Sequence, residues 1–469
     1  MHDFTSLIPL TIIGSGAILL MLFSAFEKIQ LETASYISMG FFAAAFLAQL
    51  LVGCGPETVL FDKIFNGMLV SSNFTMIAGL IILGCGFFTA MNSHTYFKIN
   101  LFCTLEFYAI MLFGACGMLL LTLSQELITA FISLEIMSLS IYILVGYDRS
   151  NVTSTEAILK YLMLGAFAGA FFTMGTALIY GGTQSTKFAE IGSFVAGHSG
   201  TNPLVLGGVF FIFVAFLFKA AAFPFHAWVI DVYDGASAPV TGFMATALKT
   251  AVFTIFANFL AINGALHNDW ITFLFYITVF TMFGGNLIAI GQNSIKRMLA
   301  ASGIVHSGYL LIALVAISTD NFTGSVVGYY LAAYAVGTLG IFSALSYLAG
   351  KGEKRATFED FKGLAKIRPY SAAAITVFLL SMAGIPPTAG FMAKFYVITS
   401  AFTAGHMALA LLGIVSSILS MWYYLRLIIN MYFHEAEEYF ETGGSSLATV
   451  ATFFLVFCVF AIGIYPIVI

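Results

Sequence analysis

Hydrophobic stretches of roughly 17–25 residues recur along this chain, and only short polar connections separate them. A stretch of that length, wound as an α-helix, crosses the hydrocarbon core of a bilayer. Backbone polar groups in lipid must be satisfied within the structure, so only helices and closed barrels span a membrane. The alternating ten-residue segments of a barrel do not recur, and only 9% of the residues are charged. The sequence therefore predicts an all-α polytopic membrane protein.

The length criterion predicts about fourteen transmembrane helices. Their expected ranges are 6–26, 33–53, 72–91, 105–122, 126–146, 156–180, 203–223, 240–262, 271–291, 300–317, 324–349, 370–403, 406–433 and 447–468. The opening MHDFTSLIPL has no positive segment and no small-residue cleavage site, so we expect the first span to be retained. The longest polar stretch, GTQSTKFAEIGSFVAGHSGTN, is predicted to be a surface loop.

Lysine and arginine are distributed unevenly between the two sets of connections. One set holds Lys28, Lys98, Arg149, Lys160, Lys296 and Arg297, together with the six basic residues of KGEKRATFEDFKGLAKIRP. The other set holds only Lys63 and Lys187. Basic residues are enriched in cytoplasmic connections, so we predict that both termini face the opposite, periplasmic side.

Two segments match each other without a gap and indicate an internal repeat. FLFKAAAFPF (216–225) aligns with FLLSMAGIPP (378–387), so that Pro224 matches Pro386 and Lys219 matches Ser381. Five spans separate the segments, and a repeat of an odd number of helices must be inverted in the membrane. We therefore expect two inverted five-helix repeats, made of helices 4–8 and 9–13. The predicted parts of the chain are 1–104 (three N-terminal helices), 105–262 (input half), 271–433 (output half) and 447–469 (a C-terminal helix).

The prolines in these segments predict that the seventh and twelfth helices are broken. A proline removes a helical hydrogen bond, which here frees the carbonyl of Ala220 in one half and those of Met382 and Ala383 in the other. Unwound backbone at membrane depth is tolerated only where it is buried in protein or lines a wet cavity. Each break should therefore bring free carbonyls and water near a lysine. A kink that serves packing alone is the alternative for either break.

Four ionisable residues lie in the middle of predicted spans: Glu135, Lys219, Lys249 and Lys394. An ionised side chain at that depth costs roughly 2.5–3.5 kcal/mol on insertion scales, so such residues are functional candidates by default. Protonatable groups of both signs suggest a proton path. The alternative is a static ion pair, for instance between Glu135 and Lys219, that fixes helix packing.

Other polar residues are weaker candidates. His306 is either a proton relay or a satisfied core histidine near Ser302 and Ser307. Asp231 and Asp234 follow the first break and are candidates for the cytoplasmic mouth of the path. The remaining ionisable groups are predicted to be interfacial (Glu106, Glu126, Lys160) or, for Arg426, an exit-side group or a lipid headgroup anchor.

The sequence lacks the patterns of a redox or nucleotide site. None of the five cysteines forms a CxxC pair, which argues against an iron–sulfur cluster or a structural zinc site. Neither a P-loop nor a GxGxxG pattern follows a strand. We expect no cofactor and no metal in this chain.

Several strings resemble the antiporter-like subunits of proton-pumping NADH:quinone oxidoreductase (respiratory complex I). They are FISLEIMSLSIYILVGY, EAILKYLMLGAFAGAF, FKAAAFPFHAWVIDVYDGASAPVTGFMATALKTAVF and SIKRMLAASGIVHSGYLLIAL. Mrp-type cation/proton antiporters and membrane-bound hydrogenases share the pattern. LSMAGIPPTAGFMAKFYV is most similar to subunit N, whose twelfth helix carries a lysine, and the chain ends without the lateral helix of subunit L.

The resemblance implies a role for each buried ionisable residue. Glu135 and Lys219 match the input pair, Lys249 the central lysine, and Lys394 the output lysine. His306 matches a polar position on the central hydrated axis.

The implied function is proton translocation in the bacterial inner membrane, coupled to quinone reduction elsewhere in the complex. NAD, FMN, iron–sulfur clusters and quinone are expected in other subunits, and the expected partners are subunits M, L, K, J, A and H with the hydrophilic arm. The alternatives are an Mrp-type antiporter or hydrogenase subunit and a purely structural scaffold.

Overall fold

The structure is a computed structural model that describes residues 2–26, 29–53, 63–197, 202–262, 264–317, 324–353, 356–436 and 446–466. The predictions that concern Lys28, Lys354 and Arg355 lie outside the described residues. Within the described residues, 12 helices are long and apolar enough to cross a membrane. Two further spans are each divided into two shorter helices. The predicted all-α fold with about fourteen spans is confirmed.

The continuous spans begin and end close to the predicted ranges. They are α1 (Ile8–Ala25), α2 (Leu31–Gly53), α4 (Asn73–Ile99), α5 (Glu106–Leu123), α6 (Leu127–Val145), α7 (Val152–Thr183), α13 (Gly264–Ile290), α14 (Ile295–Val315), α15 (Ser325–Leu348), α19 (Met407–Phe433) and α20 (Ser446–Ile464). The remaining continuous span combines α11 (Ala238–Phe243), a π-helical segment (Met244–Leu248) and α12 (Lys249–Ile262).

The two divided spans are those in which the sequence predicts breaks. The seventh consists of α9 (Pro203–Lys219) and α10 (Ala227–Gly235), and the twelfth of α17 (Pro369–Ala383) and α18 (Ala389–Thr403). The short elements are η1 (His2–Leu7), β1 (Lys63–Ile64), β2 (Leu69–Val70), α8 (Phe188–Gly197), η3 (Lys351–Glu353), η4 (Glu359–Phe361) and α16 (Leu364–Ile367).

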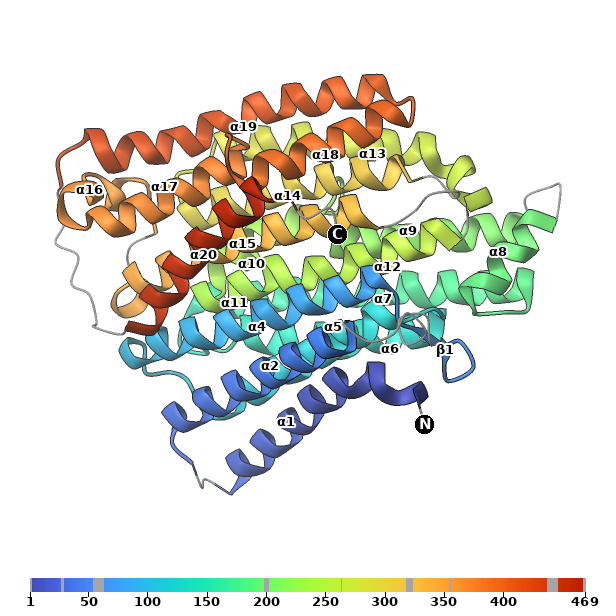
Figure 1. Cartoon of the computed structure of the whole chain (residues 1–469), viewed down its shortest axis with the longest axis horizontal. Coiled ribbons are helices and arrows are strands. Elements are labelled where there is room, and N and C mark those ends of the chain that lie inside the picture. Colours follow the sequence, from blue (N-terminus) through green and yellow to red (C-terminus); the bar gives the residue numbers. More distant parts are fainter. Residues whose placement is uncertain are drawn as a thin grey trace.

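The helices lie side by side, with α1 at one edge of the bundle and α19 at the opposite edge (Figure 1). α14 is the central helix, since every residue of its apolar window is buried inside the protein. A helix that is apolar and buried all round must contact other helices on every side. Polar side chains within this window of α14 are therefore enclosed by protein, which makes this helix the axis of the candidate site.

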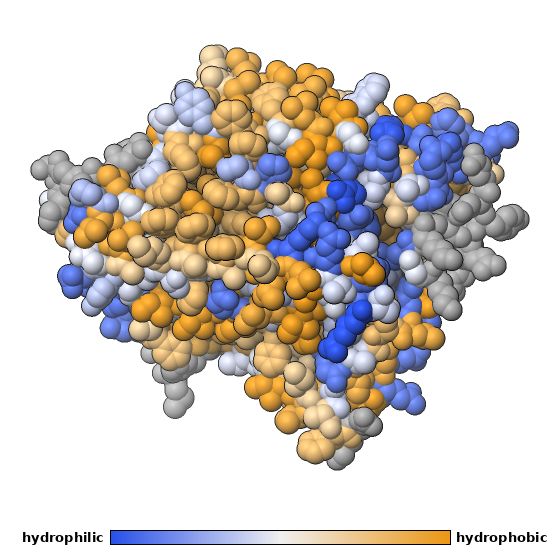
Figure 2. All heavy atoms as spheres, turned by 180° about the vertical axis from the view of Figure 1, so that it is seen from behind, coloured by the Kyte–Doolittle hydropathy of each residue, from blue (hydrophilic) through white to orange (hydrophobic). Residues whose placement is uncertain are grey.

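One end of the bundle, here called the basic end, holds the connections around residues 100, 148–151, 236–237, 292–294, 349–353 and 356–363. Two of these connections are joined where Ser294 pairs with Thr357. α16 marks the basic end in Figure 1, and the N-terminus lies at the other end. Figure 2, seen from behind, shows a broad hydrophobic surface with hydrophilic residues gathered toward the basic end. This distribution is that of a membrane-embedded body with one polar end.

Two boundaries differ from the prediction. The segment predicted to be a surface loop contains the ten-residue helix α8, because Phe188 and Ile191 lie on one side of it and are buried. The ring of Phe188 packs edge-on against Phe259 of α12, with centroids 5.2 Å apart. α14 begins at Ile295 rather than near residue 300, because the Ser294 side chain caps it by accepting a hydrogen bond from the Arg297 amide.

Candidate functional site

The first helix break begins directly after Lys219, the last residue of α9. Ala221 has a positive φ of 56°, which turns the chain out of the helical path. The Ala221 and Ala222 amides then donate to the carbonyls of Phe218 and Leu217. The freed carbonyl of Ala220 accepts a hydrogen bond of 2.6 Å from the Ser307 hydroxyl on α14. The break is thus closed by a side chain of the central helix.

The second break repeats this arrangement between α17 and α18. Gly384 has a φ of 85°, and its amide donates to the carbonyl of Ser381, while the Ile385 amide donates to that of Leu380. The freed carbonyl of Ala383 accepts a hydrogen bond of 2.9 Å from the Lys394 ammonium. A buried lysine therefore takes the place that a serine occupies in the first break.

These hydrogen bonds correct the register of the predicted repeat by one residue. Ala221 corresponds to Gly384, so Pro224 corresponds to Pro387 rather than Pro386. Lys219 then corresponds to Met382 and not to Ser381. The gapless alignment was made by matching identical apolar residues. The structural register instead depends on the residue at which the chain leaves the helix.

Lys219 is buried and turned toward α6. Its ammonium donates to the Ser138 hydroxyl at 2.8 Å and to the Tyr142 hydroxyl at 3.1 Å. Glu135 lies one turn earlier on the same helix, and its carboxylate faces Gly169 of α7. The expected ion pair is not formed, because among the described residues no Glu135 oxygen lies within 4.0 Å of the Lys219 nitrogen. The lysine is instead held by neutral hydroxyls.

Lys249 lies at the start of α12, directly after the π-helical segment. Its ammonium donates to the carbonyl of Gly303 on α14 and lies 5.2 Å from the centre of the Tyr334 ring. The Ser307 hydroxyl oxygen, whose single hydrogen points to the Ala220 carbonyl, also lies 3.1 Å from the Gly303 carbonyl oxygen. Since Ser307 bonds Ala220 and contacts the Gly303 carbonyl, one serine connects the first break to the central lysine.

His306 lies one turn further along α14 and is buried between tyrosines. Its Nδ1 is 2.7 Å from the Tyr330 hydroxyl and its Nε2 is 3.4 Å from that of Tyr424, which in turn bonds Ser302. Ser302 is thus connected to the imidazole through Tyr424, and the direct polar partners of His306 are tyrosines. The sequence offered no signal for the tyrosines, because an aromatic residue in an apolar span is ordinary.

A small cavity joins His306 to the second break. It has a volume of about 10 Å³, and its lining includes Tyr330, Tyr334, Ser381 and Gly390. That volume is about the minimum needed for one water molecule, and the lining supplies several polar partners. The cavity offers a place for a water between the histidine and the broken twelfth helix.

Lys394 is buried on α18, beyond the second break. Besides Ala383, its ammonium donates to the Ser417 hydroxyl of α19 at 3.0 Å, and it lies 5.1 Å from the centre of the Tyr309 ring. Lys219 precedes its break and Lys394 follows the other, as the sequence predicts. Within the described residues, Lys219, Lys249 and Lys394 have no carboxylate within 4.0 Å, whereas the fourth buried lysine, Lys296, pairs with Glu353.

Charged residues at the basic end form ion pairs with one another. Asp231 accepts from Lys160 at 2.7 Å and from Arg297 at 3.1 Å, and Asp234 lies 3.4 Å from Arg297. Arg426 also lies at this end, where it donates to the backbone carbonyl of Gln292 at 3.2 Å. Arg426 is therefore not at the end opposite to the basic connections, because the last turns of α19 return to them.

Glu126 lies at the end of a span, as predicted, but it is buried rather than exposed there. Its side chain is buried at the start of α6 and accepts hydrogen bonds of 2.8 Å from the Thr129 and Thr186 hydroxyls. The cause is the connection before α8, which folds over it and receives a backbone hydrogen bond from Leu127. This glutamate caps local structure and lies away from the row of lysines.

The fold and the site define a class of protein: a polytopic helical membrane protein with buried lysines beside two broken helices. The family model "NADH:quinone oxidoreductase/Mrp antiporter, TM" matches residues 124–420. The chain is 40% identical to NADH-quinone oxidoreductase subunit N of Trichlorobacter lovleyi, over 80% of this chain and 77% of the relative. It is 36% identical to subunit N 1 of Herpetosiphon aurantiacus, over 99% of this chain and 97% of the relative.

A solved structure agrees with these sequence relatives. A chain of "Respiratory complex I from Thermus thermophilus with bound Aureothin" superposes with a TM-score of 0.83 at 30% identity, covering 98% of this chain and 97% of that one. This chain belongs to the NADH:quinone oxidoreductase/Mrp antiporter transmembrane family, and within it to the subunit N sequences.

Proposed function

We propose that this chain translocates protons across the membrane along Lys219, Lys249, His306 and Lys394, as the subunit N of an NADH:quinone oxidoreductase. The observation that carries the proposal is the series of buried lysines bound by neutral groups around α14. A proton that reaches or leaves such a lysine changes the net charge of a buried site. In a medium of low dielectric, the neighbouring sites respond to that change.

The contacts suggest an order for the path. Ser307 connects the first break to Lys249 through the Gly303 carbonyl. His306 follows on the same helix, and the small cavity beside it reaches the second break and the neighbourhood of Lys394. A proton passed along this row would leave through α18 and α19. Glu135 lies near enough to act on Lys219 electrostatically, without holding it in a fixed pair.

The driving reaction belongs to other chains of the complex. We propose that the partners are membrane subunits M, L, K, J, A and H and a hydrophilic arm that carries NAD, FMN, iron–sulfur clusters and quinone. We assign no cofactor to this chain. We also propose that the basic end faces the cytoplasm, in a bacterial inner membrane, with both termini on the periplasmic side.

The test is substitution of Lys249 by methionine in the assembled complex. Proton pumping and quinone reduction should both fall by at least about tenfold, since each step that needs a positioned proton donor is affected. Lys98→Gln is the matched control, because Lys98 is half-exposed and forms an ion pair with Glu32 at the protein surface. Unchanged pumping in an assembled Lys249→Met complex would overturn the proposal and favour a structural scaffold.

The family also contains Mrp antiporters, which makes gradient-driven cation/proton exchange the second candidate. The identity to subunit N sequences favours the redox-driven complex. Transport by the native complex in vesicles without any electron donor would support the antiporter instead.

A further inference from the structure

A polar cavity of about 360 Å³ opens at the basic end, where α10 joins α11. Its polar lining residues are Tyr96, Asn100, Asp148, Asn151, Asp234, Ser237 and Glu353. None of these residues belongs to the row of buried lysines. The cavity is large enough for many water molecules and lies at the end of the broken seventh helix, so it brings water close to the junction between the seventh and eighth helices.

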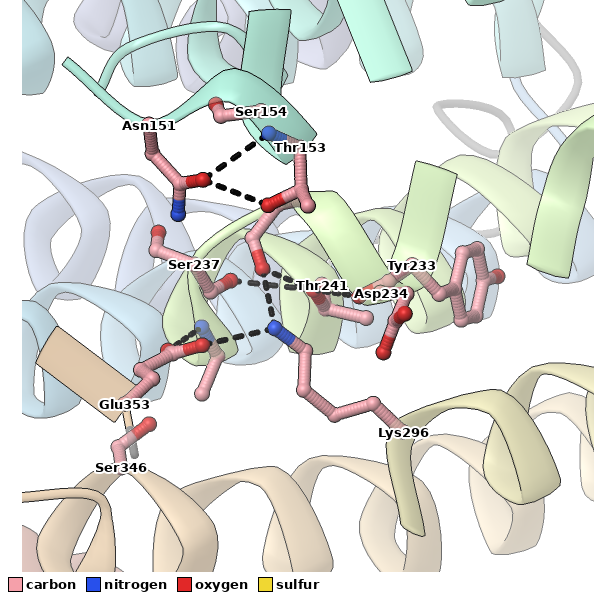
Figure 3. A network of polar contacts seen from close by, with 12 residues as sticks. Asn151, Thr153, Ser154, Tyr233, Asp234, Ser237, Thr241, Lys296, Ser346 and Glu353 are labelled. Atoms are coloured by element: carbon pink, nitrogen blue, oxygen red, sulfur yellow. Dashed lines mark hydrogen bonds and ion pairs between the residues drawn. The ribbon is translucent and has the colours of Figure 1, made fainter. Parts of the chain in front are cut away.

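Glu353 lines this cavity and contacts the junction between α10 and α11. Its carboxylate lies 2.8 Å from the Lys296 ammonium and accepts a hydrogen bond of 2.7 Å from the Ala238 amide (Figure 3). Its φ is 46°, in the left-handed region that a residue with a side chain rarely adopts. Such strain costs about 1–3 kcal/mol and persists only where the surroundings impose it.

Asn100 imposes this conformation on the connection. Its side-chain oxygen accepts from the Gly352 amide at 2.8 Å, and its nitrogen donates to the Gly350 carbonyl at 3.3 Å. Gly350 and Gly352 also have positive φ, so the chain turns inward at this point. The connection is therefore shaped to place one carboxylate under the cavity.

Lys296 connects the cavity floor to the central helix. Its side chain is only 8% exposed, against 19% for Glu353, and its ammonium also donates to the Ala236 carbonyl at 2.6 Å. Lys296 is the second residue of α14, about two turns before Gly303, whose carbonyl binds Lys249. The inner partner of the pair thus stands about 10 Å along the helix axis from the proposed proton path.

The other charged groups around the cavity are engaged elsewhere. Asp234 faces Arg297 and Ser294, and Asp148 accepts from its neighbour Ser150. Tyr96 faces Glu353 from α4. Within the described residues, Glu353 is therefore the one carboxylate that both lines this cavity and contacts a buried lysine.

We propose that Glu353 and Lys296 form the proton-intake pair of this subunit, an inference that rests on the proposed proton path. A proton from cavity water binds the Glu353 carboxylate and removes the counter-charge of Lys296. The Lys296 ammonium then gives up one proton inward, and Lys249 accepts it when its side chain is in the neutral amine form. Transfer of the proton from the Glu353 carboxylic acid to the neutral Lys296 amine restores the ion pair. One proton has moved from the cavity to the interior, and both residues have regained their starting states.

A purely structural ion pair would not require this arrangement. A buried pair contributes little net stability, because desolvation offsets the attraction between its charges. Here the pair is combined with a strained backbone and an open water-accessible cavity, and its inner partner lies on the helix that binds the central lysine. The strained backbone, the open cavity and the position of Lys296 on α14 are each what proton intake requires.

The test compares Glu353→Gln, Glu353→Asp and Glu359→Gln in the assembled complex, reconstituted in vesicles. The glutamine preserves the shape and still accepts from the Ala238 amide, but it cannot bind the transferred proton. We expect Glu353→Gln to slow proton pumping about tenfold and Glu353→Asp to restore part of the rate. The loss in Glu353→Gln should grow as the pH on the side of the basic end rises, because fewer protons are then available to the cavity. Glu359→Gln is the matched control on the same connection, since Glu359 bonds Lys362 at the surface.

The outcomes separate this inference from the proposed function. Full pumping with an unaltered pH profile in Glu353→Gln, while Lys249→Met is inactive, would overturn the intake pair and leave the proposed path standing. Full pumping in both variants would overturn both. A loss in Glu353→Gln that Glu353→Asp does not relieve, with the same loss at every pH, would identify a structural clamp and also overturn the intake role.

Discussion

At the scale of single residues, the site is built from lysines and from the neutral groups that bind them. The lysines stand out in the sequence because each interrupts an apolar span. Their partners do not stand out: serines, tyrosines and backbone carbonyls are common in membrane helices. The chemistry therefore depends on side chains that only the packing of the helices brings to the lysines.

Tyr330→Phe tests the surroundings of His306. The change removes the hydroxyl that lies 2.7 Å from Nδ1 and leaves the ring that packs beside it. We expect the complex to assemble and its pumping to slow by about tenfold, because the histidine loses the partner that sets which nitrogen carries the proton. Tyr180→Phe, on an exposed face of α7, is the control. Equal rates in the two variants would exclude Tyr330 from the path.

Gly390→Ala tests the second break. A Cβ at Gly390 would lie 1.8 Å from the backbone oxygen of Ser381, so the break cannot close around it. We expect a loss of about 1–3 kcal/mol, measured as a lower thermal midpoint of the purified complex. Gly181→Ala meets no atom within 4 Å and should leave the midpoint unchanged. A normal midpoint for Gly390→Ala would show that the two half-helices are not packed this closely.

At the scale of elements, the two breaks share a hydrogen-bond pattern but differ in what satisfies the freed carbonyl. A serine of α14 bonds Ala220, whereas Ala383 accepts from Lys394 at 2.9 Å and, at the longer distance of 3.4 Å, from Ser417. The first break is therefore tied to the central helix, whereas the second is tied to an ionisable group. Charge on Lys394 and the geometry of the second break are thus directly coupled.

Ser307→Ala tests the link between the first break and α14. The change leaves the Ala220 carbonyl buried without the side-chain donor, which costs about 1–3 kcal/mol. The thermal midpoint of the complex should fall accordingly. Ser38→Ala is the matched control, because the buried Ser38 hydroxyl donates only within its own helix. If both variants have the same midpoint, Ser307 does not support the break.

At the scale of the whole molecule, the two ends of the bundle differ in charge, and this difference predicts orientation. Ser150 at the basic end and Gln184 at the other end are both exposed. A single cysteine at position 184, in a background without native cysteines, should react with an impermeant maleimide from the periplasmic side, and one at position 150 should not. Labelling in the reverse pattern would invert the proposed topology.

The spans, the two breaks and the mid-membrane charges could be predicted from the sequence because each depends on local properties of the chain. Length, proline and charge act locally, through the thickness of the bilayer and the backbone hydrogen bonds. The predicted register of the repeat was wrong by one residue. The register is set by the turns at Ala221 and Gly384, and the alignment by residue identity did not detect these turns. The Glu353–Lys296 pair was not predicted, because the sequence placed both residues in connections with the pattern of ordinary basic loops.

By itself, the sequence determined that this chain is a helical membrane protein, where its helices break, and which lysines and which glutamate lie at membrane depth. The tertiary structure alone decided what those groups contact. Lys219 meets hydroxyls and not Glu135, His306 meets tyrosines, and Lys296 meets Glu353 beneath a cavity. The physical reason is that burial follows from local hydrophobicity, whereas a contact between residues far apart in the chain depends on how whole helices pack around α14.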